Sequence, residues 1–65
     1  MPSNTARLLR RPEVLSLTGM SRSTLYASMT LGLFPRPVRI GAQAVAWREA
    51  DVLHWIETRP EVDAA

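Results

Sequence analysis

The stretch LTGMSRSTLY, residues 17–26, decides the fold of this chain. Gly19 favours the left-handed backbone conformation in which helices commonly end. Ser21 is a preferred N-cap, the residue whose side chain accepts a hydrogen bond from the first turn of a helix. Because only Gly19, Met20 and Ser21 separate the two helices, they are expected to cross steeply. The stretch therefore predicts a helix-turn-helix.

Start and stop signals set the limits of both helices. Pro12 suits the first turn of the earlier helix, and Glu13 beside it complements the positive end of the helix dipole. This helix is expected to end at Gly19, so it is short and must be held by packing. The later helix is expected over residues 21–31, with Gly32 closing it.

Apolar side chains define the buried side of the later helix. Leu25, Tyr26 and Met29 have the spacing of a buried stripe, in which Tyr26 is expected to be half buried with its hydroxyl reaching outward. The tight turn is expected to bury Leu25 against Leu15 and to push the start of the later helix outward. This outward end offers unpaired backbone N–H groups and a positive dipole end, which suit phosphate groups and base edges. A plain helical corner with a capping serine is the alternative.

The sequence FPRPVRIGAQAVAW, residues 34–47, predicts a β-hairpin. Its two prolines exclude a helix, and Val38 and Ile40 then alternate with Arg39 as in a strand. GAQ offers a turn, after which AVAW alternates again. The hairpin is expected to carry Arg39 on its outer face and Gln43 near its tip.

A third helix is expected from Arg48 to Pro60. Glu49 and Asp51 suit its positive end, and its buried side has helical spacing at Val52, Trp55 and Ile56. Both tryptophans, Trp47 and Trp55, lie on apolar faces and are expected in the core rather than as stacking platforms for bases. His54 has no second ligand at metal-binding spacing, so it is expected at the surface and no metal site is predicted.

The order helix, turn, helix, hairpin, helix predicts a mainly α fold with a small β-hairpin, a winged helix-turn-helix. Leu8 and Leu9 are two consecutive apolar residues that suit a very short extended segment. We expect a flexible N-terminus over residues 1–6, the winged helix-turn-helix domain over residues 7–59 and a tail over residues 60–65. At 65 residues without cysteine, the chain has neither disulfides nor a thiolate zinc site to support a small core.

Charge is separated along the chain. Residues 1–48 hold seven arginines and one glutamate, a net charge of +6, whereas residues 49–65 hold one arginine and five acidic residues, a net charge of −4. A basic body suits a polyanionic partner because attraction to phosphate depends on local charge. A solvated surface of mixed sign is the alternative explanation.

The sequence lacks the motifs that enzymes, cofactor-binding proteins and membrane proteins need. There is no glycine-rich phosphate loop, no nucleophile with a spaced base and no carboxylate pair framed by a pocket, so we expect neither an enzyme nor a cofactor. No apolar run is long enough for a membrane span, and the polar start is no secretory signal. A cytoplasmic protein with no membrane partner is therefore expected, and binding of its basic body to DNA would make it nucleoid-associated.

The segment RLLRRPEVLSLTGMSRSTLYASMTLGLFPRPVRIG, residues 7–41, followed by AVAWREADVLHWI, closely resembles the AlpA family of short phage-associated transcriptional regulators. These belong with excisionase-type, MerR-like winged-helix proteins. The resemblance covers residues 7–59, and its motifs occur in order with tight spacing. It implies sequence-specific binding of double-stranded DNA, either to control a promoter or to assist an integrase in excision.

The resemblance assigns residues 21–23 and Tyr26 to the recognition helix, and Arg39 with Gln43 to the wing. Thr24 is also expected to donate a hydrogen bond to phosphate, although it can instead face the first helix. Arg10 and Arg11, before the first helix, are expected at phosphate groups, and Arg36 belongs to the same basic body. The full set of DNA-contacting candidates is Arg10, Arg11, Ser21, Arg22, Ser23, Thr24, Tyr26, Arg36, Arg39 and Gln43.

The wing departs from the family's usual pattern, because its tip carries alanines and Gln43 where relatives are more basic. With roughly three to five arginines on the binding face, each contributing about −0.9 to the salt slope, one protomer is expected to bind weakly. We therefore expect cooperative binding by self-association on DNA. The rival class is a protein adaptor whose acidic third helix docks an integrase or RNA polymerase.

Overall fold

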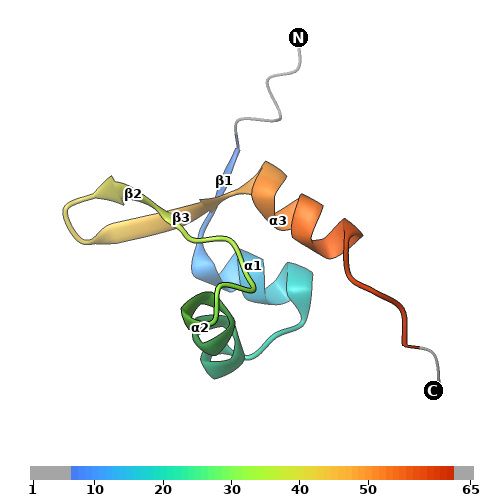
Figure 1. Cartoon of the computed structure of the whole chain (residues 1–65). Helices are drawn as coiled ribbons and strands as arrows, with labels where there is room; N and C mark the ends of the chain where they lie inside the picture. The colour runs from blue at the N-terminus through green and yellow to red at the C-terminus, as the bar shows by residue number, and fades with distance from the viewer. Residues whose placement is uncertain (1–6, 63–65) are drawn as a thin grey trace, which may run out of the picture.

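The computed structural model describes residues 7–62, which form three helices and three strands. In chain order these are β1 (Leu8–Leu9), α1 (Arg11–Thr18), α2 (Arg22–Thr30), β2 (Val38–Gly41), β3 (Ala44–Arg48) and α3 (Glu49–Glu57) (Figure 1). This is the predicted order of elements, and the predicted short extended segment at Leu8 and Leu9 is β1. The predicted flexible N-terminus and the last three residues of the predicted tail lie outside the described residues.

The turn between α1 and α2 is built as its sequence indicates. Gly19 adopts a left-handed conformation with φ of 76°, and its N–H donates to the carbonyl of Leu15 at 2.8 Å. The hydroxyl of Ser21 accepts a hydrogen bond from the backbone N–H of Thr24 at 3.2 Å. Figure 1 shows α2 nearly end-on beside an α1 that runs across the view, so the two helices cross steeply. The predicted helix-turn-helix is confirmed.

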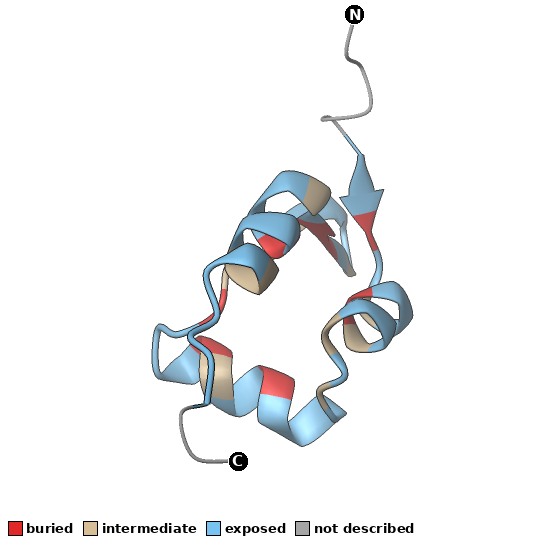
Figure 2. Cartoon of the chain, turned by 90° about the vertical axis from the view of Figure 1, so that its right-hand side faces the viewer, coloured by how far each residue is buried: buried red, intermediate tan, exposed pale blue. Residues whose placement is uncertain are grey.

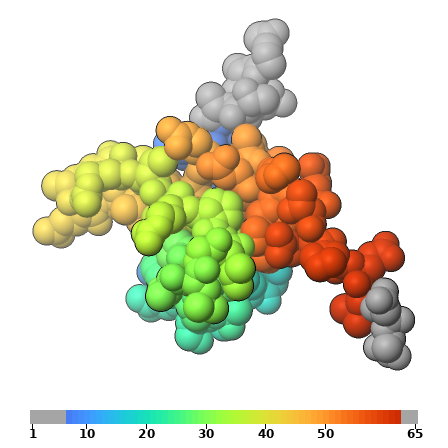
Figure 3. All heavy atoms as spheres, in the orientation of Figure 1, coloured from blue at the N-terminus to red at the C-terminus, as the bar shows by residue number. Residues whose placement is uncertain are grey.

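The three strands form an antiparallel sheet in the order β1-β3-β2. Leu9 pairs with Trp47 and Arg39 pairs with Val45, and the register shifts at a bulge between Arg39 and Gly41. The hairpin of β2 and β3, called the wing below, stands out from the body on the side away from α3 (Figure 3). Its tip is therefore free to reach a partner that also meets α2.

The core lies where the three helices meet the base of β3 (Figure 2). Its buried members are Leu9, Val14, Leu25, Met29, Phe34, Trp47 and Val52. One expectation about packing needs correction. Val14 rather than Leu15 is the fully buried residue of α1, while Leu15 is partly buried at its edge. Tyr26 is 40% exposed, in line with the half-buried position expected for it, because the core-facing side of α2 is centred on Leu25 and Met29.

Two tryptophans hold the loop that joins α2 to β2. The indole N–H of Trp47 donates to the carbonyl of Pro35 at 3.0 Å, and that of Trp55 donates to the carbonyl of Leu33 at 2.8 Å. Between them, Phe34 packs edge-to-face on Trp55 with ring centroids 4.9 Å apart. Because this loop connects α2 to the wing, these bonds fix the placement of the two relative to one another. The core position of Trp47 is confirmed, and Trp55 is partly buried against the core.

No helix within residues 7–62 has the length and apolar character needed to cross a bilayer.

Candidate nucleic-acid interface

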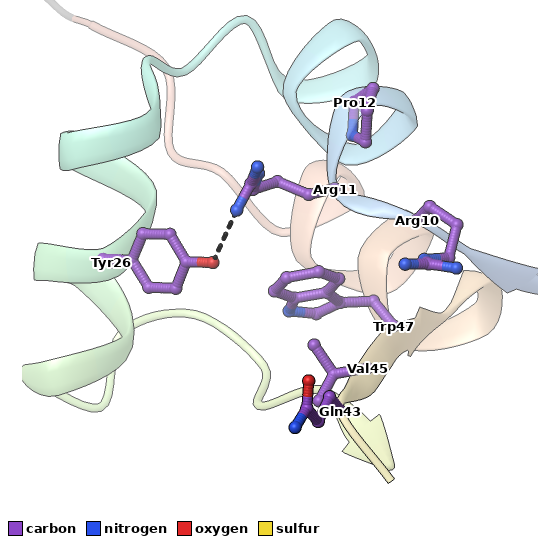
Figure 4. Close-up of a pocket in the computed structure, with 7 residues that line it drawn as sticks. All are labelled: Arg10, Arg11, Pro12, Tyr26, Gln43, Val45 and Trp47. Atoms are coloured by element: carbon purple, nitrogen blue, oxygen red, sulfur yellow. Dashed lines mark hydrogen bonds between the residues drawn. The ribbon is translucent and has the colours of Figure 1, made fainter. Parts of the chain in front are cut away.

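A groove of about 440 Å³ opens between the start of α1, the middle of α2 and the wing (Figure 4). Figure 4 shows one arginine from the start of α1 and one from the segment just before it, a tyrosine from α2, and a glutamine and a valine from the wing, around the ring of Trp47. Its lining is Arg10, Arg11, Pro12, Tyr26, Gln43, Val45 and Trp47. The groove therefore brings together predicted site residues that come from three separate elements. We call it the arginine groove.

Arg11 and Tyr26 join α1 to α2 across the arginine groove. Nη1 of Arg11 donates to the hydroxyl oxygen of Tyr26 at 3.3 Å. Because the tyrosine hydroxyl accepts this bond, its own proton remains free for an outside acceptor. Both arginines were expected before the first helix, but α1 begins one residue earlier than predicted, with Arg11 as its first residue and Arg10 as its N-cap. Both side chains line the groove, where an anion can reach them.

The start of α2 presents a linked set of hydroxyl groups. The Ser21 hydroxyl donates to Oγ1 of Thr24 at 2.9 Å and lies 3.4 Å from that of Ser23. Thr24 accepts within this set, so its own proton can still be donated outward. Arg22 is exposed and lies four residues before Tyr26, which places both on one side of the helix. This end of α2 lies outside the arginine groove but continues the face that Tyr26 contributes to it.

Gln43 and Arg39, the two polar side chains that were predicted at the wing, take different positions. Gln43 lines the arginine groove, whereas Nη1 of Arg39 donates to the carbonyl of Ala42 at 3.0 Å, folding back over the turn of the hairpin. Arg39 is exposed as predicted, and its register places it across from Val45 on one face of the wing. Arg36 is exposed in the loop before β2 and does not line the groove.

The family model for the prophage CP4-57 regulatory protein AlpA matches residues 7–60. The chain belongs to the AlpA family. It is 45% identical over 53 residues to an uncharacterised protein, ORF88, of Enterobacteria phage P4. The matched region covers 82% of this chain and 60% of ORF88. It is 32% identical over 62 residues to the DNA-binding transcriptional activator AlpA of Escherichia coli strain K12, covering 86% of this chain and 89% of that protein. The predicted resemblance, over residues 7–59, is confirmed.

Two arginines of this AlpA-family chain have their charge matched by acidic or aromatic side chains. Arg7 forms ion pairs with Glu13 at 2.9 Å and Glu49 at 3.3 Å. Arg59 lies over the ring of Trp55, with its guanidinium carbon 4.2 Å from the ring centroid. The remaining arginines have no carboxylate within ion-pair distance among residues 7–62. Most of the positive charge is therefore available to an outside anion.

Sequence reasoning missed three residues of the arginine groove in this AlpA-family chain, namely Pro12, Val45 and Trp47. The two residues of the hairpin could have been found from the sequence. Gln43, Val45 and Trp47 alternate along the hairpin, and alternate residues of a strand share one face. The prediction of Gln43 at the interface therefore implied that Val45 lies beside it. His54 is exposed, and within the described chain no cluster of metal-binding side chains forms.

Proposed function

We propose that this AlpA-family protein is a sequence-specific DNA-binding transcriptional regulator. In this proposal α2 enters the major groove, and the wing lies along the backbone or in the minor groove. The observation that carries it is the arginine groove, in which Arg10, Arg11, Tyr26 and Gln43 converge beside the exposed start of α2. The E. coli relative, described as a DNA-binding transcriptional activator, supports the same proposal.

Each part of the interface has a separate role in this proposal. Arg22, at the exposed start of α2, contacts a base edge or phosphate, and Ser23 and Thr24 donate to the backbone. Arg10 and Arg11 bind phosphate within the arginine groove. The hydroxyl of Tyr26 accepts from Arg11 at 3.3 Å and can donate its own proton to the same phosphate.

The wing contributes fewer charges than the helices. Arg39 and Gln43 are its candidate contacts, with Arg36 beside it in the loop before β2, and Arg39 already donates one bond to the hairpin turn. The residues at the tip other than Gln43 are small and uncharged. A protomer with so few cations at the duplex binds weakly, because affinity for DNA depends on the number of phosphates neutralised. We therefore propose that several protomers bind cooperatively to repeated sites.

Footprinting on the DNA that flanks the protein's own coding region tests this function. Protection at a promoter, reduced by Arg22→Ala and retained by Arg59→Ala, is the expected result. Protection beside an attachment site would instead indicate an excisionase that assists an integrase, since both roles use the same contacts. Binding to a protein partner with no protection of any duplex would indicate an adaptor that docks through its acidic third helix.

A further inference from the structure

A second groove, of about 250 Å³, lies between α1 and α3 and shares no lining residue with the arginine groove. Leu17 of α1 and Leu53 of α3 form its apolar walls and are 48% and 41% exposed. Its complete lining is Arg7, Leu9, Glu13, Ser16, Leu17, Glu49 and Leu53. We call it the leucine groove. Two half-exposed leucines flanking one hollow form a surface that an apolar side chain from outside can cover.

The rim of the leucine groove is acidic. Glu13 and Glu49 share the single guanidinium of Arg7, so these three side chains carry a net charge of −1. Glu57 lies one helical turn after Leu53 on the same side of α3, and it is exposed. An apolar segment with neighbouring positive charge therefore fits this groove better than a neutral or acidic one.

The same chain presents such a segment. Leu31 and Leu33 are 70% and 61% exposed and flank Gly32, whose φ of 75° makes the tight turn after α2. Arg36 follows them and is exposed. No acidic residue occurs anywhere in residues 14–48. We call Leu31 and Leu33 the leucine knob; in Figure 3 this segment lies on the visible surface beside α3.

The knob and the groove lie on opposite sides of α3. Leu53 borders the leucine groove, whereas the indole of Trp55 donates to the carbonyl of Leu33 in the knob at 2.8 Å. Two residues along an α-helix correspond to a rotation of about 200°. The knob of one molecule therefore cannot enter its own groove, whereas the knob of a second copy can.

We propose that the leucine knob of one protomer docks into the leucine groove of the next when both are bound to DNA. The contact is heterologous, so each added protomer keeps one free knob or groove, and a row can extend along a duplex. It rests on the proposed function, because it explains how weakly binding protomers cooperate. Four leucines make a small interface, which matters only when DNA raises the local concentration of protomers.

The test uses the full-length chain and two duplexes of random sequence at low salt, one that holds a single protomer and one that holds several. Leu33→Glu alters the knob and adds a charge that the acidic rim repels. Leu53→Glu alters the groove and places a charge in its apolar wall, which docking would have to remove from water. Leu8→Glu is the matched control, since Leu8 is 43% exposed and lines neither groove. Circular dichroism establishes that all three variants are folded.

Both Leu33→Glu and Leu53→Glu should bind the short duplex like the wild type and lose cooperativity on the long one. We expect apparent affinity for the long duplex to fall about tenfold, which corresponds to roughly 1.4 kcal/mol. An equimolar mixture of the two variants should form pairs on the long duplex but no longer rows, because one intact knob still meets one intact groove. Leu8→Glu should behave as the wild type.

Other results would overturn the inference. If Leu53→Glu leaves cooperativity intact while Leu33→Glu abolishes it, the contact joins two knobs. If Leu33→Glu weakens binding to both duplexes equally, the knob faces DNA. If the wild type binds the short duplex and shows no cooperativity on the long one, the docking contact is refuted and the proposed DNA-binding function stands. If the wild type binds neither duplex, both proposals are refuted.

Discussion

Replacing Arg22 by alanine should weaken DNA binding without weakening the fold. Arg22 is the first residue of α2, is exposed, and forms no side-chain hydrogen bond or ion pair within residues 7–62. Alanine has the highest helix propensity, so the start of α2 should be preserved. The Ser21 cap accepts from the backbone of Thr24 and does not involve the Arg22 side chain. Any loss of affinity therefore reports a lost contact to DNA.

The expected size follows from the number of arginines on the proposed face. Arg10, Arg11, Arg22, Arg36 and Arg39 would give a slope of log K against log salt of about −4.5 per protomer, at roughly −0.9 per phosphate contact. If Arg22 contacts phosphate, Arg22→Ala should reduce the slope by about 0.9. If it instead reads a base, affinity should fall by about 1–3 kcal/mol with loss of preference at that base.

Fluorescence anisotropy with a labelled short duplex, repeated over a series of salt concentrations, measures both quantities. Arg59→Ala is the matched control, because it removes the same charge from a side chain that stacks on Trp55 beyond the end of α3. The control should leave the slope unchanged. Equal effects of the two substitutions on slope and affinity would mean that only overall charge matters, and the proposed role of α2 would then be wrong.

The remaining predictions concern individual contacts. Trp47→Phe removes the N–H that donates to the carbonyl of Pro35, and it should lower the free energy of unfolding by about 1–3 kcal/mol in urea denaturation; an unchanged midpoint would show that this bond is not needed. Gly19→Ala should cost about 1–2 kcal/mol by the same assay, because φ is 76° and nothing lies within 4 Å of an added Cβ, so the cost is backbone strain alone. Tyr26→Phe should leave stability nearly unchanged and weaken binding to a short duplex by about 1 kcal/mol, because it removes the hydroxyl that accepts from Arg11. Binding equal to the wild type would place this hydroxyl away from DNA.

The fold could be predicted from the sequence where its signals are local. Gly19 and Ser21 act through their own backbone and cap, so the helix-turn-helix could be placed within a residue. The change to alternating apolar residues likewise predicted the wing over residues 34–47, and its strands span residues 38–48. Each of these signals depends on a few consecutive residues and needs no knowledge of distant contacts.

The arginine groove could be anticipated only in part, because it depends on contacts between distant segments. Arg11 and Tyr26 are 15 residues apart in the sequence. The spacing of Tyr26 matched a buried stripe, and only the position of α1 and the wing shows that its ring opens onto a groove instead. The pairing of Leu9 with Trp47, which joins β1 to β3, is equally long-range.

Mapping amide chemical shifts by NMR during titration with a duplex tests most directly whether α2 and the wing form the DNA-binding face. The largest changes are expected at residues 21–26 and 39–45 and at Arg10 and Arg11, with little change on the outer side of α3. Changes concentrated along α3 and around Leu17, with residues 21–26 unaffected, would contradict the proposed interface.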